Sequence, residues 1–365
     1  MPIHHRRLLK GALLTICLIV AATMLRLALE WRQALANIDA MIVTPVAISI
    51  PTEASLVGEP QPADQVATPV SIPVATPVAE LLAPTPVDKP TPNLSQAMLT
   101  ILLLGTDRRP NDTEVTRTDA LMLVRIDRDR QQVSILSIPR DLWVNYAGGG
   151  EGRINAAYAL GERRFGPGGG AAMAKSTVEQ LLDISVDHFV LLNFQGFQQI
   201  IEQIGGIEID IPDAIYDPTY PTEDYGTMEV RFEAGPQLLD AERALIYART
   251  RHADNDFGRN QRQQLVLMAI FDRIRERGLL HQLTNLDDYT GAMRDYMQTD
   301  LSRGRMLELV GFARGIGNDD ILRYAINSRA IVDLSPPATF AADPQALMGI
   351  MRQFTGEAVS SAGGS

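Results

Sequence analysis

The sequence predicts an α/β protein with a three-layer α-β-α architecture and a central mixed, partly antiparallel sheet. Three apolar runs between residues 98 and 138 follow one another without an intervening helix, which indicates neighbouring antiparallel strands. Further apolar runs then alternate with segments of helical pattern, which favours helical layers around the sheet. An apolar stretch and a proline-rich stretch come first and predict one transmembrane helix followed by a linker.

Composition narrows the class of protein. The chain has 365 residues, 45% of them hydrophobic, which is enough for one large domain or two small ones. Its formal net charge of −11 argues against nucleic acid as the main partner, because a duplex-binding protein normally presents a basic face. The single cysteine, Cys17, excludes a disulfide framework and a cysteine-based metal site.

The apolar stretch at residues 8–29 is predicted to be a transmembrane signal-anchor helix. As a helix it is roughly 33 Å long, enough to cross a hydrocarbon core of ~30 Å, with Arg26 reaching the far interface. Basic residues place the N-terminus, residues 1–7, in the cytoplasm and the rest of the chain outside the cell membrane. A cleaved signal peptide is the alternative, with a site at residues 34–36.

Residues 37–95 contain half of the chain's 22 prolines. Such a segment predicts an extended, disordered linker that holds the following domain away from the membrane. The catalytic domain is expected at residues 96–275, and residues 276–358 are expected to form a C-terminal helical extension, with helix starts near Ser302 and Asp343.

Polar residues stand at the ends of the three apolar runs. Asp107 follows the first run, Asp119 precedes the second and Arg140 follows the third. In neighbouring antiparallel strands these three ends share one edge of the sheet. We therefore expect the three side chains to converge.

The stretch at residues 247–263 gathers four arginines within fourteen positions, namely Arg249, Arg251, Arg259 and Arg262. A guanidinium group binds two oxygens at once, so the cluster predicts a site for phosphate or carboxylate groups. A solvated helix start is the alternative. Arg259 and Gln263 are i,i+4 neighbours on one helix face, whereas Arg262 is expected to form a surface pair.

Six segments, in order, resemble the LytR–CpsA–Psr family of membrane-anchored cell-wall phosphotransferases. They are residues 102–109, 116–123, 137–141, 153–158, 205–212 and 247–263. The resemblance implies an extracytoplasmic, Mg²⁺-dependent enzyme that transfers a glycopolymer, through a phosphodiester, from a polyprenyl pyrophosphate carrier. The acceptor would be peptidoglycan or another glycan of the cell envelope.

The resemblance also implies roles for individual residues. Asp107 and Asp119 would hold Mg²⁺, which takes one or two carboxylates and shares its other positions with substrate phosphate. The pyrophosphate would be bound by Arg117, Arg140, Arg249, Arg251, Arg259 and Gln263. Catalysis would depend on Arg249, Arg251 and Asp256.

Some assignments stay open at this stage. Either Asp254 or Asp256 could face the site, because the stretch between Arg251 and Asp256 is shorter than in many members of the family. Asp256 could also cap the following helix. Either Arg108 or Arg109 could likewise face the site. The general base could be Asp256 or Asp141, and Asp141 could instead orient Arg140.

Four apolar residues could line a tunnel for a polyprenyl tail, although an ordinary core explains them equally well and is favoured. They are Phe189, Leu191, Phe194 and Phe197. The alternative functions are a polyprenyl-pyrophosphate hydrolase, with water as acceptor, and a non-catalytic protein that binds polyprenyl-linked glycans. A transcriptional regulator is not favoured, because the sequence shows neither helix-turn-helix spacing nor a basic recognition face.

Overall fold

The computed structural model describes residues 32–43, 46, 97–107, 115–222, 226–251, 256–284, 296–335 and 339–357. Among these residues, none of the helices combines the length and the apolar character that a membrane span requires. The predicted membrane helix at 8–29 lies outside the described residues. So do residues 1–7 and three of the open site candidates, Arg108, Arg109 and Asp254.

A six-stranded mixed sheet, in the order β11-β6-β1-β2-β3-β12, forms the centre of the fold. The prediction of three consecutive antiparallel strands is confirmed: β1 (Met98–Thr106) pairs with β2 (Thr118–Asp127), and β2 pairs with β3 (Gln132–Ser137). The other strands are β6 (His188–Asn193), parallel to β1, β12 (Ile321–Ala325), parallel to β3, and β11 (Met297–Thr299), antiparallel to β6.

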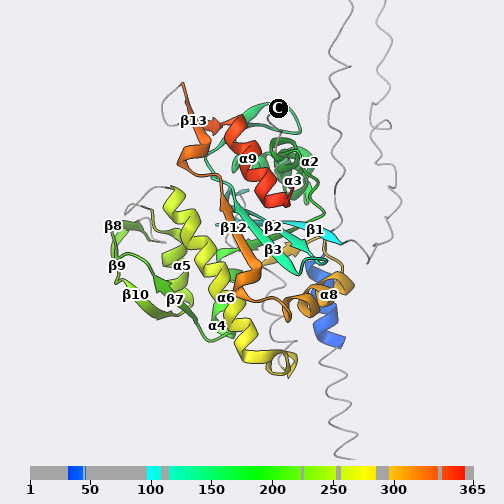
Figure 1. Cartoon of the computed structure of the whole chain (residues 1–365), viewed down its shortest axis with the longest axis vertical. Helices are drawn as coiled ribbons and strands as arrows, with labels where there is room; N and C mark the ends of the chain where they lie inside the picture. Colours follow the sequence, from blue (N-terminus) through cyan, green and yellow to red (C-terminus); the bar gives the residue numbers. More distant parts are fainter. Residues whose placement is uncertain are drawn as a thin grey trace, which may run out of the picture.

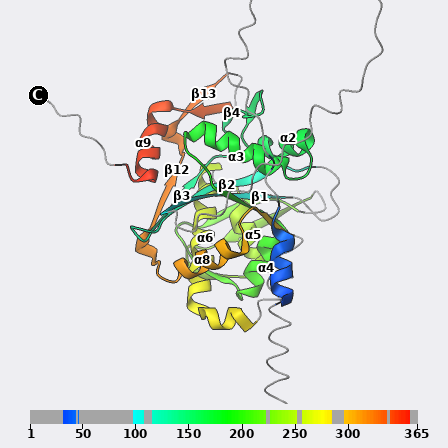
Figure 2. The same ribbon diagram turned by 90° about the vertical axis from the view of Figure 1, so that its right-hand side faces the viewer.

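Helices cover both faces of this sheet, which confirms the three-layer prediction (Figures 1 and 2). One layer holds α2 (Ala156–Phe165), α3 (Gly169–Leu182) and α9 (Pro344–Thr355). The other holds α4 (Phe194–Gln203), α5 (Ala241–Arg249), α6 (Asp256–Thr284) and α8 (Arg303–Ala313). Because both faces are covered, β1 is apolar on both sides and appears in the sequence as a continuous apolar run.

Shorter elements surround this framework. The small strand pairs are β4 (Trp143–Asn145) with β5 (Glu151–Arg153), β7 (Ile207–Ile211) with β10 (Gly235–Leu239), β8 (Ile215–Pro221) with β9 (Thr227–Phe232), and β13 (Ile331–Leu334) with β14 (Thr339–Ala342). Two 3₁₀ turns, Asn318–Asp320 and Ser328–Ala330, flank β12.

Side-chain caps begin three helices, and two of these starts, those of α8 and α9, are where the sequence predicts them. The carboxylates of Asp240 and Asp343 each accept a backbone N–H three residues later, at 2.8 Å, at the starts of α5 and α9. The Ser302 hydroxyl accepts from the Arg305 N–H at 3.3 Å and begins α8. Each cap satisfies one of the backbone donors that a helix N-terminus leaves without an intrahelical partner.

Two of the predicted boundaries are wrong. Residues 32–41 form a helix and Ile42 bridges to Thr299, so the expected linker at 37–95 begins within ordered chain. Residues 276–358 are not a helical extension, because β11 and β12 complete the central sheet and α6 continues across the expected boundary at 275. These strands are only three and five residues long, too short for a period-2 pattern to identify them.

Candidate active site

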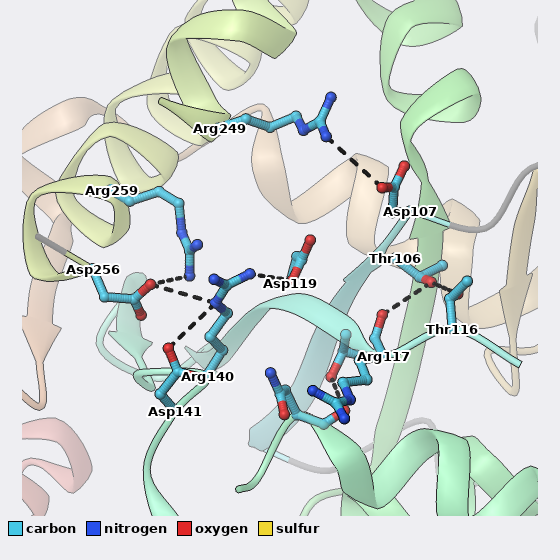
Figure 3. Close-up of polar contacts among 12 residues, drawn as sticks. Thr106, Asp107, Thr116, Arg117, Asp119, Arg140, Asp141, Arg249, Asp256 and Arg259 are labelled. Carbon is cyan, nitrogen blue, oxygen red and sulfur yellow. Dashed lines mark hydrogen bonds and ion pairs between the residues drawn. The ribbon is translucent and has the colours of Figure 1, made fainter. Parts of the chain in front are cut away.

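The ends of β1, β2 and β3 lie together at one edge of the sheet, as the strand pattern predicts. Arg140, just after β3, donates a hydrogen bond from Nη1 to Oδ1 of Asp119 at the start of β2 (Figure 3). Asp107 follows β1 and reaches Arg249, with Oδ2 at 3.8 Å from Nη2 (Figure 3). The chain folds this way because antiparallel neighbours bring alternate strand ends to the same edge.

Arg140 is the centre of the charge network. Its Nε lies 3.4 Å from Asp256 Oδ1 and 3.6 Å from Asp141 Oδ2. Burial acts to lower the pKa of Arg140, but the nearby carboxylates outweigh it and raise the pKa above the usual value. Asp141 also lies 3.4 Å from Arg153, so its carboxylate is shared between two arginines.

Asp256 faces the site and bridges two arginines. Its Oδ1 lies 2.5 Å from Nη2 of Arg259, whose side chain is only 3% exposed. Burial lowers the pKa of Arg259 to about 10, which still leaves the guanidinium charged at neutral pH. Burial also raises the pKa of Asp256, although Arg259 and Arg140 both act to lower it. A carboxylate held in this way can accept a proton more readily than an exposed one.

Arg249 approaches the same space from the end of α5 (Figure 3). Its Nη1 donates to the Tyr220 hydroxyl at 3.2 Å, and its guanidinium lies 4.4 Å from the centre of the Phe194 ring. The aromatic contacts fix the direction of the guanidinium and leave its charge available to an anion. Arg251 is exposed and lines the mouth of the same cavity.

The prediction that Arg262 forms a surface pair is wrong. Its side chain is buried, and it donates to the backbone carbonyl oxygens of Tyr247, at 3.1 Å, and Thr250. These carbonyls lie at the C-terminal end of α5, where a helix lacks internal donors. Thr250 is also held by its hydroxyl, which donates to Oδ2 of Asp217 at 2.5 Å. The turn between Arg249 and Arg251 is thus fixed from two sides. Composition and spacing do not reveal this structural role of Arg262.

The remaining two phosphate-binding candidates differ in position. Gln263 lines the cavity, and its amide nitrogen lies 3.5 Å from the Ala248 carbonyl oxygen. Arg117 is exposed and is not among the residues that line the cavity. The structure therefore brings five of the six candidates together and leaves Arg117 outside.

An apolar cavity of about 340 Å³ begins at these arginines and lies between the sheet and the layer of α4, α5 and α6. Phe194 and Phe197 line it, whereas Phe189 and Leu191 are buried in the core. The favoured interpretation, an ordinary core, is therefore confirmed for Phe189 and Leu191, whereas Phe194 and Phe197 border a cavity. Sequence reasoning missed most of the apolar lining, which includes Leu103, Val190, Ile200, Val266, Leu267 and Ile270. Their pattern is that of ordinary core residues.

Asp107 and Asp119 are the two carboxylates that the family resemblance implies for Mg²⁺, and each lies beside an arginine, Arg249 and Arg140 respectively. Within the described ranges, no group of three or more His, Cys, Asp or Glu side chains is arranged to hold a metal. Two carboxylates nevertheless fit Mg²⁺, which often binds only one or two and keeps waters or substrate phosphate in its other positions. Figure 3 shows both carboxylates bordering the space between Arg140 and Arg249.

Known proteins are similar to this chain in sequence and in fold. A polyisoprenyl-teichoic acid–peptidoglycan teichoic acid transferase, TagU of Halalkalibacterium halodurans, is 34% identical over 225 residues, which cover 60% of this chain and 67% of TagU. The chain covers a smaller share of TagV and TagT of Bacillus subtilis, 62% and 60% of their lengths.

Solved structures agree in fold. The crystal structure of B. subtilis TagV has a TM-score of 0.59 and 27% identity, and the match covers 72% of this chain and 98% of TagV. A structure of TagT bound to LI-WTA has a TM-score of 0.54 and 27% identity, covering 72% of this chain and 90% of TagT. Residues 77–339, most of the chain, match the LytR_cpsA_psr family, and the protein belongs to that family.

Proposed function

We propose that the protein transfers a glycopolymer from a polyprenyl pyrophosphate carrier to a hydroxyl group of peptidoglycan or of another envelope glycan. The main support for this proposal is the shape of the site, an apolar cavity that ends at a cluster of arginines. A lipid pyrophosphate has the same two parts, an apolar chain and a compact dianionic head. The names of TagU, TagV and TagT, and the TagT structure bound to LI-WTA, support this choice.

The reaction follows from the placement of charge. The acceptor oxygen attacks the phosphorus next to the glycan, the bond from that phosphorus to the bridging oxygen breaks, and polyprenyl phosphate leaves. Arg140, Arg249 and Arg259 neutralise the charge that develops on the phosphoryl oxygens. The acceptor proton passes to a carboxylate, and Asp256 is the candidate because burial raises its pKa.

Mg²⁺ is proposed as the cofactor, held by Asp107 and Asp119. When bound, it would supply positive charge to the pyrophosphate oxygens and so stabilise the leaving group. Arg249, which lies beside Asp107, supplies positive charge from the chain itself at the same place. Residues 8–29 are proposed to anchor the protein in the cell membrane, with the catalytic domain outside the cell.

The test uses the full-length chain in detergent, with a short polyprenyl-pyrophosphate-linked saccharide and a peptidoglycan oligosaccharide, with and without Mg²⁺. We expect a phosphodiester-linked product that requires Mg²⁺ and is lost in Arg249→Ala and Asp107→Ala. The matched control is Arg163→Ala, an exposed arginine on α2. Release of polyprenyl phosphate without a joined product would instead support the hydrolase, and tight binding without turnover would exclude both enzymes.

The dependence of the transfer rate on pH tests the role of Asp256. A base acts in its deprotonated form, and a raised pKa moves the acidic limb of the rate profile above the ordinary aspartate value of 3.8. Asp256→Asn is expected to remove this limb and to lower the rate by about 10²- to 10⁴-fold. Asp141→Asn serves as the control for the loss of a carboxylate beside Arg140, because Asp141 contacts Arg140 and Arg153. This variant is expected to keep the acidic limb. An unchanged limb in Asp256→Asn would show that another group is the base.

A further inference from the structure

Residues 32–43 are built into the catalytic domain instead of leading away from it. The helix at 32–41 buries Ala34, Ile38 and Met41, which are spaced i, i+4, i+7 along one face. Ile38 and Met41 pack against four apolar side chains of the domain, Leu192, Ile200, Met297 and Met306. Figure 2 shows this helix, in blue, beside α4 and α8.

Backbone and charged contacts complete the attachment. Ile42 forms a parallel bridge with Thr299 of β11, and the Val43 N–H donates to the Thr299 carbonyl oxygen at 2.8 Å. Asp39 Oδ2 lies 2.5 Å from Nη2 of Arg303 on α8. The segment thus continues the central sheet beyond its β11 edge. A main-chain bridge requires a defined register, so this is a specific contact.

The attachment lies on the wall of the apolar cavity. Three of the side chains that pack against Ile38 and Met41, namely Leu192, Ile200 and Met297, also line the cavity. The cavity crosses the sheet from Asp119 on β2 to Met297 on β11. Residues 38–42 therefore lie at the end of the cavity that is remote from Arg140.

The neighbouring helix α8 presents a stripe suited to a lipid surface. Arg303, Leu307, Val310 and Arg314 follow the spacing i, i+4, i+7, i+11 and so share one face. Leu307 is 49% exposed and Val310 is 43% exposed. Leu307 and Val310 stand next to the exposed Arg314, and apolar side chains beside a cation match the boundary between acyl chains and anionic headgroups, whereas Arg303 is held by Asp39.

We propose that residues 32–43 hold the catalytic domain against the bilayer, with the α8 stripe facing the headgroups and the apolar end of the cavity turned toward the lipid. This inference rests on the proposed function and on the membrane helix at 8–29. Ala34, the first buried residue of the attachment, is five residues beyond Leu29, a reach of at most about 18 Å.

The proline-rich stretch then has a different role from that of a spacer between membrane and domain. Residues 44–96 connect Val43 to Ala97, and both of these residues belong to the folded domain. A segment whose two ends lie on the same domain does not set the distance between that domain and the membrane. A polyprenyl chain can then pass from the bilayer into the cavity while its pyrophosphate stays at the arginines, close to the lipid surface.

The test measures the position of the domain in proteoliposomes that contain the full-length chain with Cys17→Ser. A fluorophore is attached through Leu307→Cys on the stripe or through Glu229→Cys on β9, which lies on the opposite side of the domain (Figure 1). Quenching by headgroup-labelled lipid is expected to be at least threefold stronger at position 307. Equal quenching at the two positions would overturn the proposal.

Detachment is tested with a matched pair of variants. Ile38→Asp places a charge in the buried contact, whereas Ala36→Asp places the same charge on the exposed face of the same helix. Ile38→Asp, or Ile38→Ala should the aspartate prevent folding, is expected to remove most of the difference in quenching, and Ala36→Asp to preserve it. A difference that persists in a folded Ile38 variant would contradict the attachment.

Activity gives a second measurement. With a long-chain donor embedded in the same bilayer, Ile38→Asp is expected to lower transfer at least tenfold, whereas a short-chain donor added from solution is used within twofold of the unmodified chain. If the unmodified chain used neither donor, the proposed function would fail, and the quenching comparison would still decide whether the domain is held at the bilayer. Equal loss with both donors would overturn the role in lipid entry.

Discussion

Arg140→Ala is expected to reduce kcat/KM for transfer by about a thousandfold or more. The Arg140 guanidinium lies among the carboxylates of Asp119, Asp141 and Asp256. Without it, the phosphate of the substrate loses a cation and meets carboxylates whose charge is no longer balanced. Arg140→Lys is expected to restore little, because an ammonium group cannot bind two oxygens in the forked geometry of a guanidinium.

The loss has to be separated from unfolding. Removing one partner of a buried ion pair costs about 3–5 kcal/mol, and less is expected here because the Asp119 side chain is 32% exposed. Thermal denaturation of the variant is therefore measured first, and the kinetics are measured at a temperature at which the variant is folded. Arg163→Ala controls for the loss of a surface arginine. More than a tenth of the original kcat/KM in folded Arg140→Ala would contradict the central position of this residue.

Val190→Trp is expected to make the enzyme selective for short lipid donors. Val190 lies on β6 and lines the apolar cavity, so an indole ring at this position occupies space that the proposed polyprenyl chain requires. Displacing one five-carbon isoprene unit loses up to about 4 kcal/mol of burial at ~0.8 kcal/mol per carbon. We expect KM for a long-chain donor to rise at least tenfold and KM for a short-chain donor to change less than twofold.

The control for this variant is Val332→Trp, because Val332 is 42% exposed on β13 and does not line the cavity. Steady-state kinetics with donors of two chain lengths gives the comparison. A similar rise in KM for both donors would indicate a general disturbance of the fold, and no rise for either would place the lipid chain elsewhere.

Much of the fold follows from local patterns that the sequence contains. The apolar runs of β1 to β3 identify three antiparallel strands, and the side chains of Ser302 and Asp343 mark helix starts that the structure confirms. The meeting of Asp119 and Arg140 follows from strand direction alone. In each case the residues that determine the feature lie within a short stretch of the sequence.

Other features depend on contacts between distant parts of the chain. Spacing along the chain does not place Arg262, because its partners, the Tyr247 and Thr250 carbonyls, become accessible only when α5 ends beside α6. The helix at 32–41 falls partly within the predicted linker, since its short apolar face is buried only when β11 is present. The cavity lining has the composition of a core, so sequence alone does not separate the two.

The pairing of β12 with β3 has a consequence for the order of folding. β3 is complete early in the chain, but the strand that covers its outer edge, Ile321–Ala325, is made long afterwards. The Gln264 amide, which donates to the Ser137 hydroxyl at 2.8 Å and the Tyr324 carbonyl at 2.7 Å, joins the two strands only when both are present. At a synthesis rate of about 5–20 residues per second, β3 stays an open edge for roughly ten seconds or more. An open strand edge can pair with another chain, so the nascent protein is exposed to aggregation during this interval.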